Sequence, residues 1–199
     1  MRYTMILMGT ALAFAANGAF AASAGQAAPD FTVTDSTGKA VHLADYKGKF
    51  VVLEWTNPEC PFVQKHYNSA NMQSLQKEWG VKDVVWLTVN STNQSSSEYK
   101  SGAQMNSWMR TQGAAQKAVL IDSDSATGQK YSAKTTPHMF VVDPKGQIVY
   151  AGAIDDKRSA RQEDVKTANN YVRVALTEAM AGKPVSTPNT TPYGCSVKY

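Results

Sequence analysis

Three short apolar runs, separated by segments of helical periodicity, constrain the fold of this chain most strongly. The runs are residues 50–55, which include one acid, 83–89 and 118–121. Runs of this length and composition are typical of strands buried on both faces of a sheet. The segments 61–79 and 98–112 carry apolar residues at helical spacing. This alternation predicts an α/β domain built around a central sheet.

Two hairpin signals frame the alternation. Residues 28–43 contain a turn at 35–38 between two extended stretches, which predicts an amino-terminal β-hairpin. A second hairpin is predicted over 135–150 and an amphipathic helix over 165–180. Residues 184–199 are rich in Thr and Pro and are expected to lack regular structure. We therefore expect one domain with a mixed sheet and helices on both faces.

The first residues have the order of an export signal. Arg2 precedes an apolar run over residues 5–20, and small residues follow it. This pattern predicts a secretory signal peptide over residues 1–24. The alternative is an uncleaved anchor, but the run is shorter than the roughly 20 residues that span a bilayer, which favours cleavage after Ala21 or Ala24. The mature protein is then expected in the periplasm or outside the cell, without a stable membrane anchor.

Charge and motif content narrow the possible ligands. The formal net charge is +4, and the basic residues are scattered, so nucleic acid is not expected as a partner. Glycine-rich phosphate or dinucleotide loops are not found, so we expect no cofactor. The adjacent acids Asp155 and Asp156 lack further ligand spacing, so we expect no metal and interpret both as solvated or capping residues. The sequence leaves the oligomeric state open.

The chain has two cysteines, Cys60 and Cys195. Both lie in the predicted exported part, where a disulfide can persist as a structural link or as a redox couple. Cys60 lies between the strand predicted over 50–55 and the helix predicted from Pro61, which suits a first helical turn. A helix amino terminus presents unpaired N–H groups that favour the nucleophilic thiolate. Cys60 is therefore the candidate nucleophile; the alternative is an inert or disulfide-bonded cysteine.

The order of elements, with a Cys at the first strand–helix junction and Thr-Pro entering the last hairpin, resembles the thioredoxin superfamily. The chain is more closely similar to its redoxin (AhpC/TSA, peroxiredoxin-like) branch, and to an exported subgroup with a Cys-Pro-Phe-Val core. Four segments carry this resemblance: 54–67, 136–143, 152–156 and 193–199. It implies a thioredoxin-like fold over residues 25–183, followed by a carboxy-terminal tail, 184–199, that carries Cys195.

The resemblance implies a thiol-dependent oxidoreductase or peroxidase that acts on a peroxide or a disulfide and is recycled by a thiol reductant protein. Four positions depart from the relatives. Val63 stands where a thioredoxin has its second Cys, and Leu53 and Asn57 stand where a peroxiredoxin has Pro and Thr. Gln64 likewise replaces the second Cys of copper-handling relatives, which makes that function the weakest alternative.

Cys195 is the candidate resolving thiol, because a long tail can bring it to Cys60 at modest loop-closure cost. Two alternatives stay open. Cys60 and Cys195 can form a permanent disulfide in a non-catalytic binding protein, or Cys195 can act elsewhere or between subunits. Lys65 and His66, five and six residues after Cys60, are expected to lie away from the sulfur.

Glu54 interrupts an apolar strand six residues before Cys60. The resemblance implies a proton relay, since a buried carboxyl has a raised pKa; the alternative is that Glu54 faces solvent or a basic partner. The resemblance also implies a cis bond between Thr136 and Pro137, beside the sulfur, with Thr136, Pro137, His138 and Pro61 forming the substrate-binding region. His138 can approach Cys60 or point away, because alternate strand residues face opposite sides.

Overall fold

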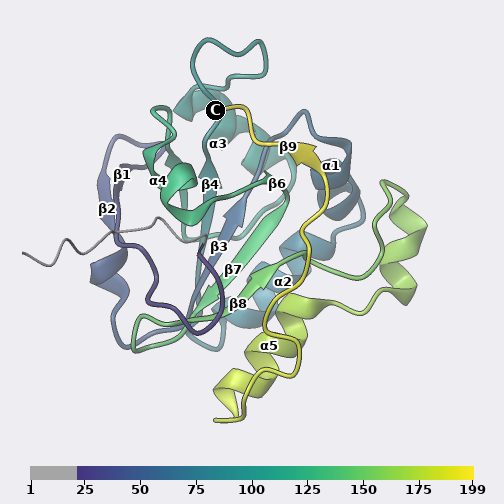
Figure 1. The fold of residues 1–199 in the computed structure, drawn as a ribbon. Coiled ribbons are helices and arrows are strands. Elements are labelled where there is room, and N and C mark those ends of the chain that lie inside the picture. The colour runs from purple at the N-terminus through teal and green to yellow at the C-terminus, as the bar shows by residue number, and fades with distance from the viewer. Residues whose placement is uncertain (1–21) are drawn as a thin grey trace, which may run out of the picture.

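The computed structural model describes residues 22–199 and shows a central sheet between two layers (Figure 1). The sheet has the strand order β5-β4-β3-β7-β8. Strands β3, β4 and β5 run parallel, whereas β7 and β8 pair antiparallel. The strand bounds are β3 Val51–Trp55, β4 Val85–Asn90, β5 Ala118–Ile121, β7 His138–Val142 and β8 Ile148–Gly152. The predicted α/β fold with a mixed sheet is confirmed.

Alternate side chains of the sheet face two separate cores. Val52 of β3 and Met139 of β7 pack against four helices on one face, whereas Leu53 and Phe140 pack on the other. The four helices are α1 Pro61–Asn68, α2 Asn71–Gly80, α3 Gly102–Thr111 and α5 Tyr171–Met180. The other face is covered by the hairpin of β1 Thr32–Thr34 and β2 Ala40–His42, the 3-10 helix η1 Leu43–Tyr46 and helix α4 Ala126–Tyr131. The amino-terminal hairpin is thus confirmed.

The single helix predicted over 61–79 is wrong, because the structure divides it into α1 and α2. The chain takes a left-handed conformation at Ala70, with φ of 58°. Tyr67 and Met72 are both buried in the same core, yet five residues of continuous helix would turn them about 140° apart. The break returns both to the sheet, and the Gln73 side chain donates to the Tyr67 carbonyl oxygen at 2.9 Å.

The helix predicted over 165–180 also begins later. Residues Gln162–Thr167 form a 3-10 helix, η2, and α5 starts at Tyr171. The Asn170 side chain accepts a hydrogen bond from the Arg173 backbone N–H at 2.9 Å. Asn is a favoured residue at this capping position, so Asn170 sets the start of the helix.

The expectation that residues 184–199 lack regular structure is wrong. Strand β9, Cys195–Ser196, pairs antiparallel with β6, Thr135–Thr136, as the yellow arrow in Figure 1 shows. Earlier in the tail, the Pro188 carbonyl accepts a hydrogen bond from the Ala151 N–H, and the Thr190 N–H donates to the Ala151 carbonyl. Sheet edges present unpaired backbone groups, and the tail satisfies those of β6 and β8.

The predicted signal peptide lies, up to residue 21, outside the described residues. Within residues 22–199, none of the helices has the length and apolar character needed to cross a bilayer.

Candidate active site

Cys60 occupies the amino-terminal cap of α1, directly after the carboxyl end of β3. Pro61 is the first helical residue, as predicted, and the Gln64 N–H donates to the Cys60 carbonyl at 2.9 Å. The Asn57 side chain holds the preceding loop, since it accepts from the Glu59 N–H at 2.9 Å and donates to Glu98 at 2.6 Å. Asn57, where a peroxiredoxin has Thr, is therefore used to shape this loop. Only 1% of the Cys60 surface is exposed.

The cis-proline segment lies beside the sulfur. The Thr136–Pro137 bond is cis, as predicted. Cys60 Sγ donates to the Thr136 carbonyl oxygen at 2.9 Å. Strand β6 ends at this carbonyl, so the Cys60 sulfur lies at the place where the chain offers backbone groups to an extended partner strand.

Cys195 reaches Cys60 through strand β9. Its backbone N–H donates to Cys60 Sγ over 3.4 Å, and both cysteines are free. Burial, a hydrogen bond with the Cys60 side chain and the charge of Cys60 raise the pKa of Cys195 to about 12. Cys195 is therefore a protonated thiol at neutral pH, whereas the nucleophilic form of a cysteine is the thiolate.

Gly194 allows this approach. Its φ is 132°, a conformation that residues with a side chain rarely adopt. A Cβ at this position would overlap the Thr136 carbonyl oxygen. The glycine thus lets Cys195 lie against both Cys60 and the cis-proline segment.

Glu54 is fully buried, so the alternative that it faces solvent is wrong. Its carboxylate accepts from the side chains of Tyr67 at 2.9 Å and Trp86 at 2.8 Å, with longer bonds from Thr88 and Gln76. Burial raises the pKa of Glu54 to about 7, and these donors oppose the rise. Glu54 can therefore change charge near neutral pH; its role as a relay to Cys60 stays a prediction.

His138 points away from Cys60. It shares a sheet face with Phe140, whose ring centroid is 4.5 Å away, whereas Cys60 packs with Met139 on the other face. The His138 Nδ1 accepts from the Lys134 N–H at 3.2 Å. Burial and the nearby Lys134 charge lower the pKa of His138 to about 3, so the ring is neutral. The structure thus decides against an acid–base role for His138 at the sulfur.

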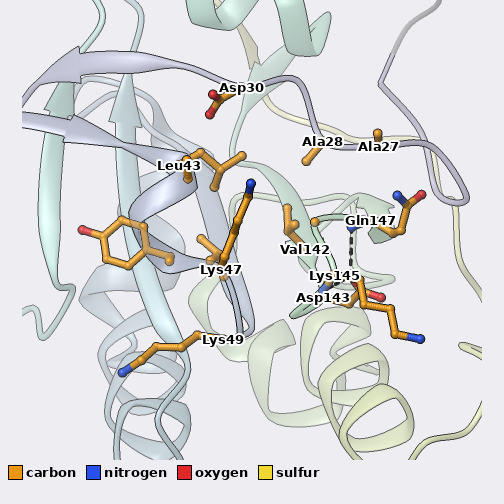
Figure 2. A pocket seen from close by; sticks show the side chains of 14 residues that line it. Ala27, Ala28, Asp30, Leu43, Lys47, Lys49, Val142, Asp143, Lys145 and Gln147 are labelled. Carbon is orange, nitrogen blue, oxygen red and sulfur yellow. Dashed lines mark hydrogen bonds between the residues drawn. The ribbon is translucent and has the colours of Figure 1, made fainter.

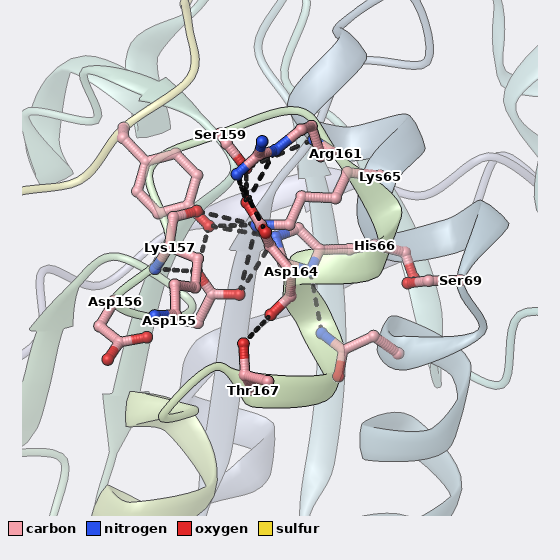
Figure 3. Close-up of polar contacts among 12 residues, drawn as sticks. Lys65, His66, Ser69, Asp155, Asp156, Lys157, Ser159, Arg161, Asp164 and Thr167 are labelled. Carbon is pink, nitrogen blue, oxygen red and sulfur yellow. Dashed lines mark hydrogen bonds and ion pairs between the residues drawn. The ribbon is translucent and has the colours of Figure 1, made fainter.

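A buried polar cluster beside the tail was not identified as part of the site from the sequence. Lys65 and His66 of α1 lie against Asp155, with nitrogen–oxygen distances of 3.5 and 3.9 Å (Figure 3). Tyr193 of the tail donates from its hydroxyl to Asp155. The expectation that Asp155 is solvated is wrong, because only 1% of it is exposed, whereas its Oδ1 does cap the following turn by accepting from the Lys157 N–H at 3.0 Å. The available signal was a Lys-His pair inside a helix with an otherwise apolar inner face.

A cavity of about 230 Å³ lies beside the start of β3 (Figure 2). Its lining includes Leu43, Val51 and Val142, with Lys47 and Lys145 among the charged residues. Val51 begins β3, whereas Cys60 follows the other end of that strand, so this cavity does not belong to the cysteine site. In the part of the chain that the structure describes, no group of three or more His, Cys, Asp or Glu side chains is arranged to hold a metal ion.

Comparisons with known proteins agree with this geometry. Residues 24–151 match the AhpC/TSA family. The chain is 28% identical over 128 residues to the thiol-disulfide oxidoreductase ResA of Bacillus subtilis (strain 168), which spans 64% of this chain and 65% of ResA. The chain thus covers slightly less than two thirds of the length of that relative.

Two solved structures show the fold. An uncharacterized conserved protein from Geobacillus kaustophilus superposes with a TM-score of 0.76 at 26% identity, over 88% of this chain and 92% of that one. The exposed lipoprotein thioredoxin Etrx1 of Streptococcus pneumoniae strain TIGR4 superposes with a TM-score of 0.50 at 26% identity, over 70% of this chain and 99% of that one. With a thioredoxin-like fold, a cysteine at the strand–helix junction and a family match over more than half its length, the chain belongs to the AhpC/TSA family.

Proposed function

We propose that this protein is an exported thiol–disulfide oxidoreductase in which Cys60 is the nucleophile and Cys195 the resolving thiol. The observation that carries the proposal is the approach of the two cysteines, with the Cys195 N–H 3.4 Å from Cys60 Sγ. The similarity to ResA, a thiol-disulfide oxidoreductase, supports the same chemistry. Position 63, where a thioredoxin has its second Cys, holds a buried Val, and in this proposal Cys195 of the tail takes that role instead.

The reaction proceeds by two thiol–disulfide exchanges. The Cys60 thiolate attacks one sulfur of a substrate disulfide, forms a mixed disulfide and releases the first substrate thiolate, which takes a proton. Cys195 then loses its proton and attacks Cys60 Sγ, which forms the Cys60–Cys195 disulfide and releases the second substrate thiol. The substrate gains two electrons and the two protein thiols lose them. A thiol reductant protein returns both cysteines to the reduced state.

The substrate is proposed to bind along β6. Thr136 and Pro137 end this strand beside the sulfur, and Pro61 lies exposed next to Cys60. The two tail residues of β9 now hydrogen-bond to β6. An extended segment of a substrate protein would form the same antiparallel pairing after the tail moves aside.

The experiment compares a disulfide with a peroxide as oxidant. The reduced protein and its Cys60→Ser and Cys195→Ser variants are mixed with a model protein disulfide or with hydrogen peroxide, and the products are mapped without reduction. We expect the wild type to reduce the disulfide and to accumulate a Cys60–Cys195 crosslink. The Cys60→Ser variant loses both, and Cys195→Ser stops at a mixed disulfide.

Two outcomes would contradict the proposal. Consumption of peroxide in strong preference to disulfide would assign a peroxidase. An unreactive Cys60 at neutral pH, with a crosslink that no dithiol reduces, would assign a non-catalytic protein with a structural disulfide. Export is tested by amino-terminal sequencing of the secreted or periplasmic protein, where we expect a chain that begins after Ala21 or Ala24.

A further inference from the structure

The buried polar cluster joins the helix that begins at Cys60 to the tail that carries Cys195. Lys65 and His66 lie within the second turn of α1, and their side chains are 0% exposed. Asp155 follows β8, and Tyr193 lies two residues before Cys195. Burial of a charged pair is costly unless its polar groups are satisfied, so the contacts of this cluster are informative.

The Tyr193 hydroxyl uses all of its hydrogen-bonding capacity in the cluster. It donates to Asp155 and faces Lys65 Nζ at 3.4 Å and His66 Nε2 at 3.3 Å. Asn71 donates to His66 Nδ1 at 2.9 Å, so Nε2 carries the proton and donates to Tyr193. A tyrosine hydroxyl has one hydrogen and two lone pairs, and each has a partner here.

The tyrosine ring is held as well. It packs edge-on against Phe62, with centroids 5.8 Å apart, and Lys65 Nζ lies 5.5 Å from its centroid. Lys65 also donates to the Lys157 carbonyl at 2.8 Å, so its ammonium group is fixed independently of the tail (Figure 3). We call the residues that surround the Tyr193 side chain the socket. They come from α1 and from the segment after β8, and the tail supplies only the ring and hydroxyl of Tyr193.

The socket lies close to the reacting sulfur along the chain. Phe62 is two residues after Cys60, and Tyr193 is two residues before Cys195. Gly194 gives the intervening backbone a conformation that brings the Cys195 N–H to Cys60 Sγ. The position of the Tyr193 side chain in the socket therefore constrains the position of Cys195.

We propose that the cluster of Lys65, His66, Asp155 and Tyr193 is a latch that docks the tail so that Cys195 lies against Cys60. This inference rests on the proposed function, because it assigns Tyr193 and Asp155 as positioning residues for the second exchange. A closed latch covers Cys60 and raises the effective concentration of Cys195 at its sulfur. An open latch exposes Cys60 and the edge of β6 to the substrate.

The test follows both exchanges with 5,5′-dithiobis(2-nitrobenzoate), an aromatic disulfide that releases one coloured thiolate at each exchange. The reduced full-length protein is compared with Tyr193→Phe and Asp155→Asn. In the wild type the second release is intramolecular, so its rate does not depend on reagent concentration, and mass spectrometry finds the Cys60–Cys195 disulfide. In Tyr193→Phe we expect the first release to be about tenfold faster and the second about tenfold slower, the scale of one hydrogen bond to a charged group.

The product distribution separates positioning from general destabilisation. We expect Tyr193→Phe and Asp155→Asn to yield a protein with two aromatic adducts in place of the internal disulfide. Tyr131→Phe is the matched control, because Tyr131 is buried and its hydroxyl donates to the Pro29 carbonyl at 2.8 Å in the core of the other face. It loses a hydroxyl in the same way and should keep the wild-type rates and product.

The outcomes for the latch and for the proposed function differ. Two releases from the wild type, with rates and products of Tyr193→Phe equal to those of Tyr131→Phe, would overturn the latch alone. A single release from the wild type, with Cys195 left as a free thiol, would overturn the proposed function and the latch together. Tyr193→Phe changes no charge, so it decides the question should Asp155→Asn, which leaves the buried Lys65 without its anion, fold poorly.

Discussion

Two buried carboxylates contact helix α1, and they differ in the groups that face them. Glu54 accepts hydrogen bonds from four neutral side chains, one of which is Tyr67 of α1. Asp155 faces the ammonium group of Lys65, from the same helix, at 3.5 Å. Neutral donors reduce but do not remove the cost of a buried charge, whereas a buried cation compensates it directly.

The different partners of Glu54 and Asp155 suit the two carboxyl groups to different roles. The pKa of Glu54 is raised to about 7 by burial, so its charge changes within the physiological range. Asp155 is paired with Lys65 and bonded to Tyr193, which suits a permanent anchor. Glu54 is thus placed to change its charge, whereas Asp155 holds the tail. Variants at each acid and its partners test this difference.

The largest effect is expected from Lys65→Met. This change leaves the Asp155 charge buried without its cation, which typically costs about 3–5 kcal/mol of unfolding free energy. Denaturant unfolding at pH 7 measures it. Lys49→Met is the control: its ion pair with Asp83 is exposed, with side chains 44% and 77% accessible, and such pairs contribute less than about 1 kcal/mol. Equal losses in the two variants would show that the Asp155 charge is not compensated by Lys65.

Glu54→Gln should change the pH dependence of stability. Because the pKa of Glu54 is raised from 4.5 to about 7 in the folded state, its favourable contribution is fully present below pH 4.5 and is lost as pH rises through 7. The wild type should therefore lose up to about 3 kcal/mol relative to the variant between pH 4.5 and pH 8. Unfolding of both proteins at several pH values gives this difference.

The unfolding free energy of the wild type is compared with that of Glu54→Gln because other groups also make stability depend on pH. The pKa of His66 is lowered to about 3 by burial and by Lys65, so its contribution is present above pH 6.5 and is lost as pH falls. This term cancels between the wild type and Glu54→Gln. A flat difference for Glu54→Gln would remove the contrast between the two acids.

Gly194→Ala should loosen the tail without affecting Glu54. The added Cβ would overlap the Thr136 carbonyl oxygen, and the φ of 132° is strained for alanine. We expect iodoacetamide to alkylate Cys60 about tenfold faster, as a shift of about 1.4 kcal/mol in tail docking would produce. Gly182→Ala is the matched control, since its φ is also positive but its Cβ would meet nothing within 4 Å. Unchanged Cys60 alkylation in Gly194→Ala would argue against a covering role for the tail.

The smallest effect concerns the predicted relay from Glu54 to Cys60. If Glu54 moves protons for this sulfur, the rate of Cys60 alkylation should show an inflection near pH 7 that Glu54→Gln lacks, with a change of roughly threefold. Alkylation is followed by mass spectrometry in a Cys195→Ser background, so that one thiol reacts. Identical pH profiles in the two proteins would limit Glu54 to a structural role.

The order of strands and helices was predictable because each element carries a local signal. The runs at 50–55 and 118–121 are apolar except for Glu54, and Pro61 marks the start of α1. The break at Ala70 carries no comparable signal: it arises because Tyr67 and Met72 must both reach the sheet. The start of α5 was missed although Asn170 is a typical cap.

The residues of the candidate site also differ in whether a local sequence signal predicted them. Cys60 was predicted from its place at the strand–helix junction and the cis-proline from the family resemblance, whereas the sequence left open whether Glu54 is buried or faces solvent. The direction of His138 was open, since it depends on which face of β7 meets α1. The latch was missed because its members come from three distant parts of the sequence.

The sequence by itself determined the fold class and the position of the candidate nucleophile, because periodicity, Pro61 and the strand–helix junction act within a few residues of one another. Only the tertiary structure decided the partner of Cys60. Strand β9 pairs with β6 across 58 residues of intervening chain, and Tyr193 enters a socket made by α1 and Asp155. Such contacts depend on complementary shape and on compensation of buried charge, which arise only after the chain has folded.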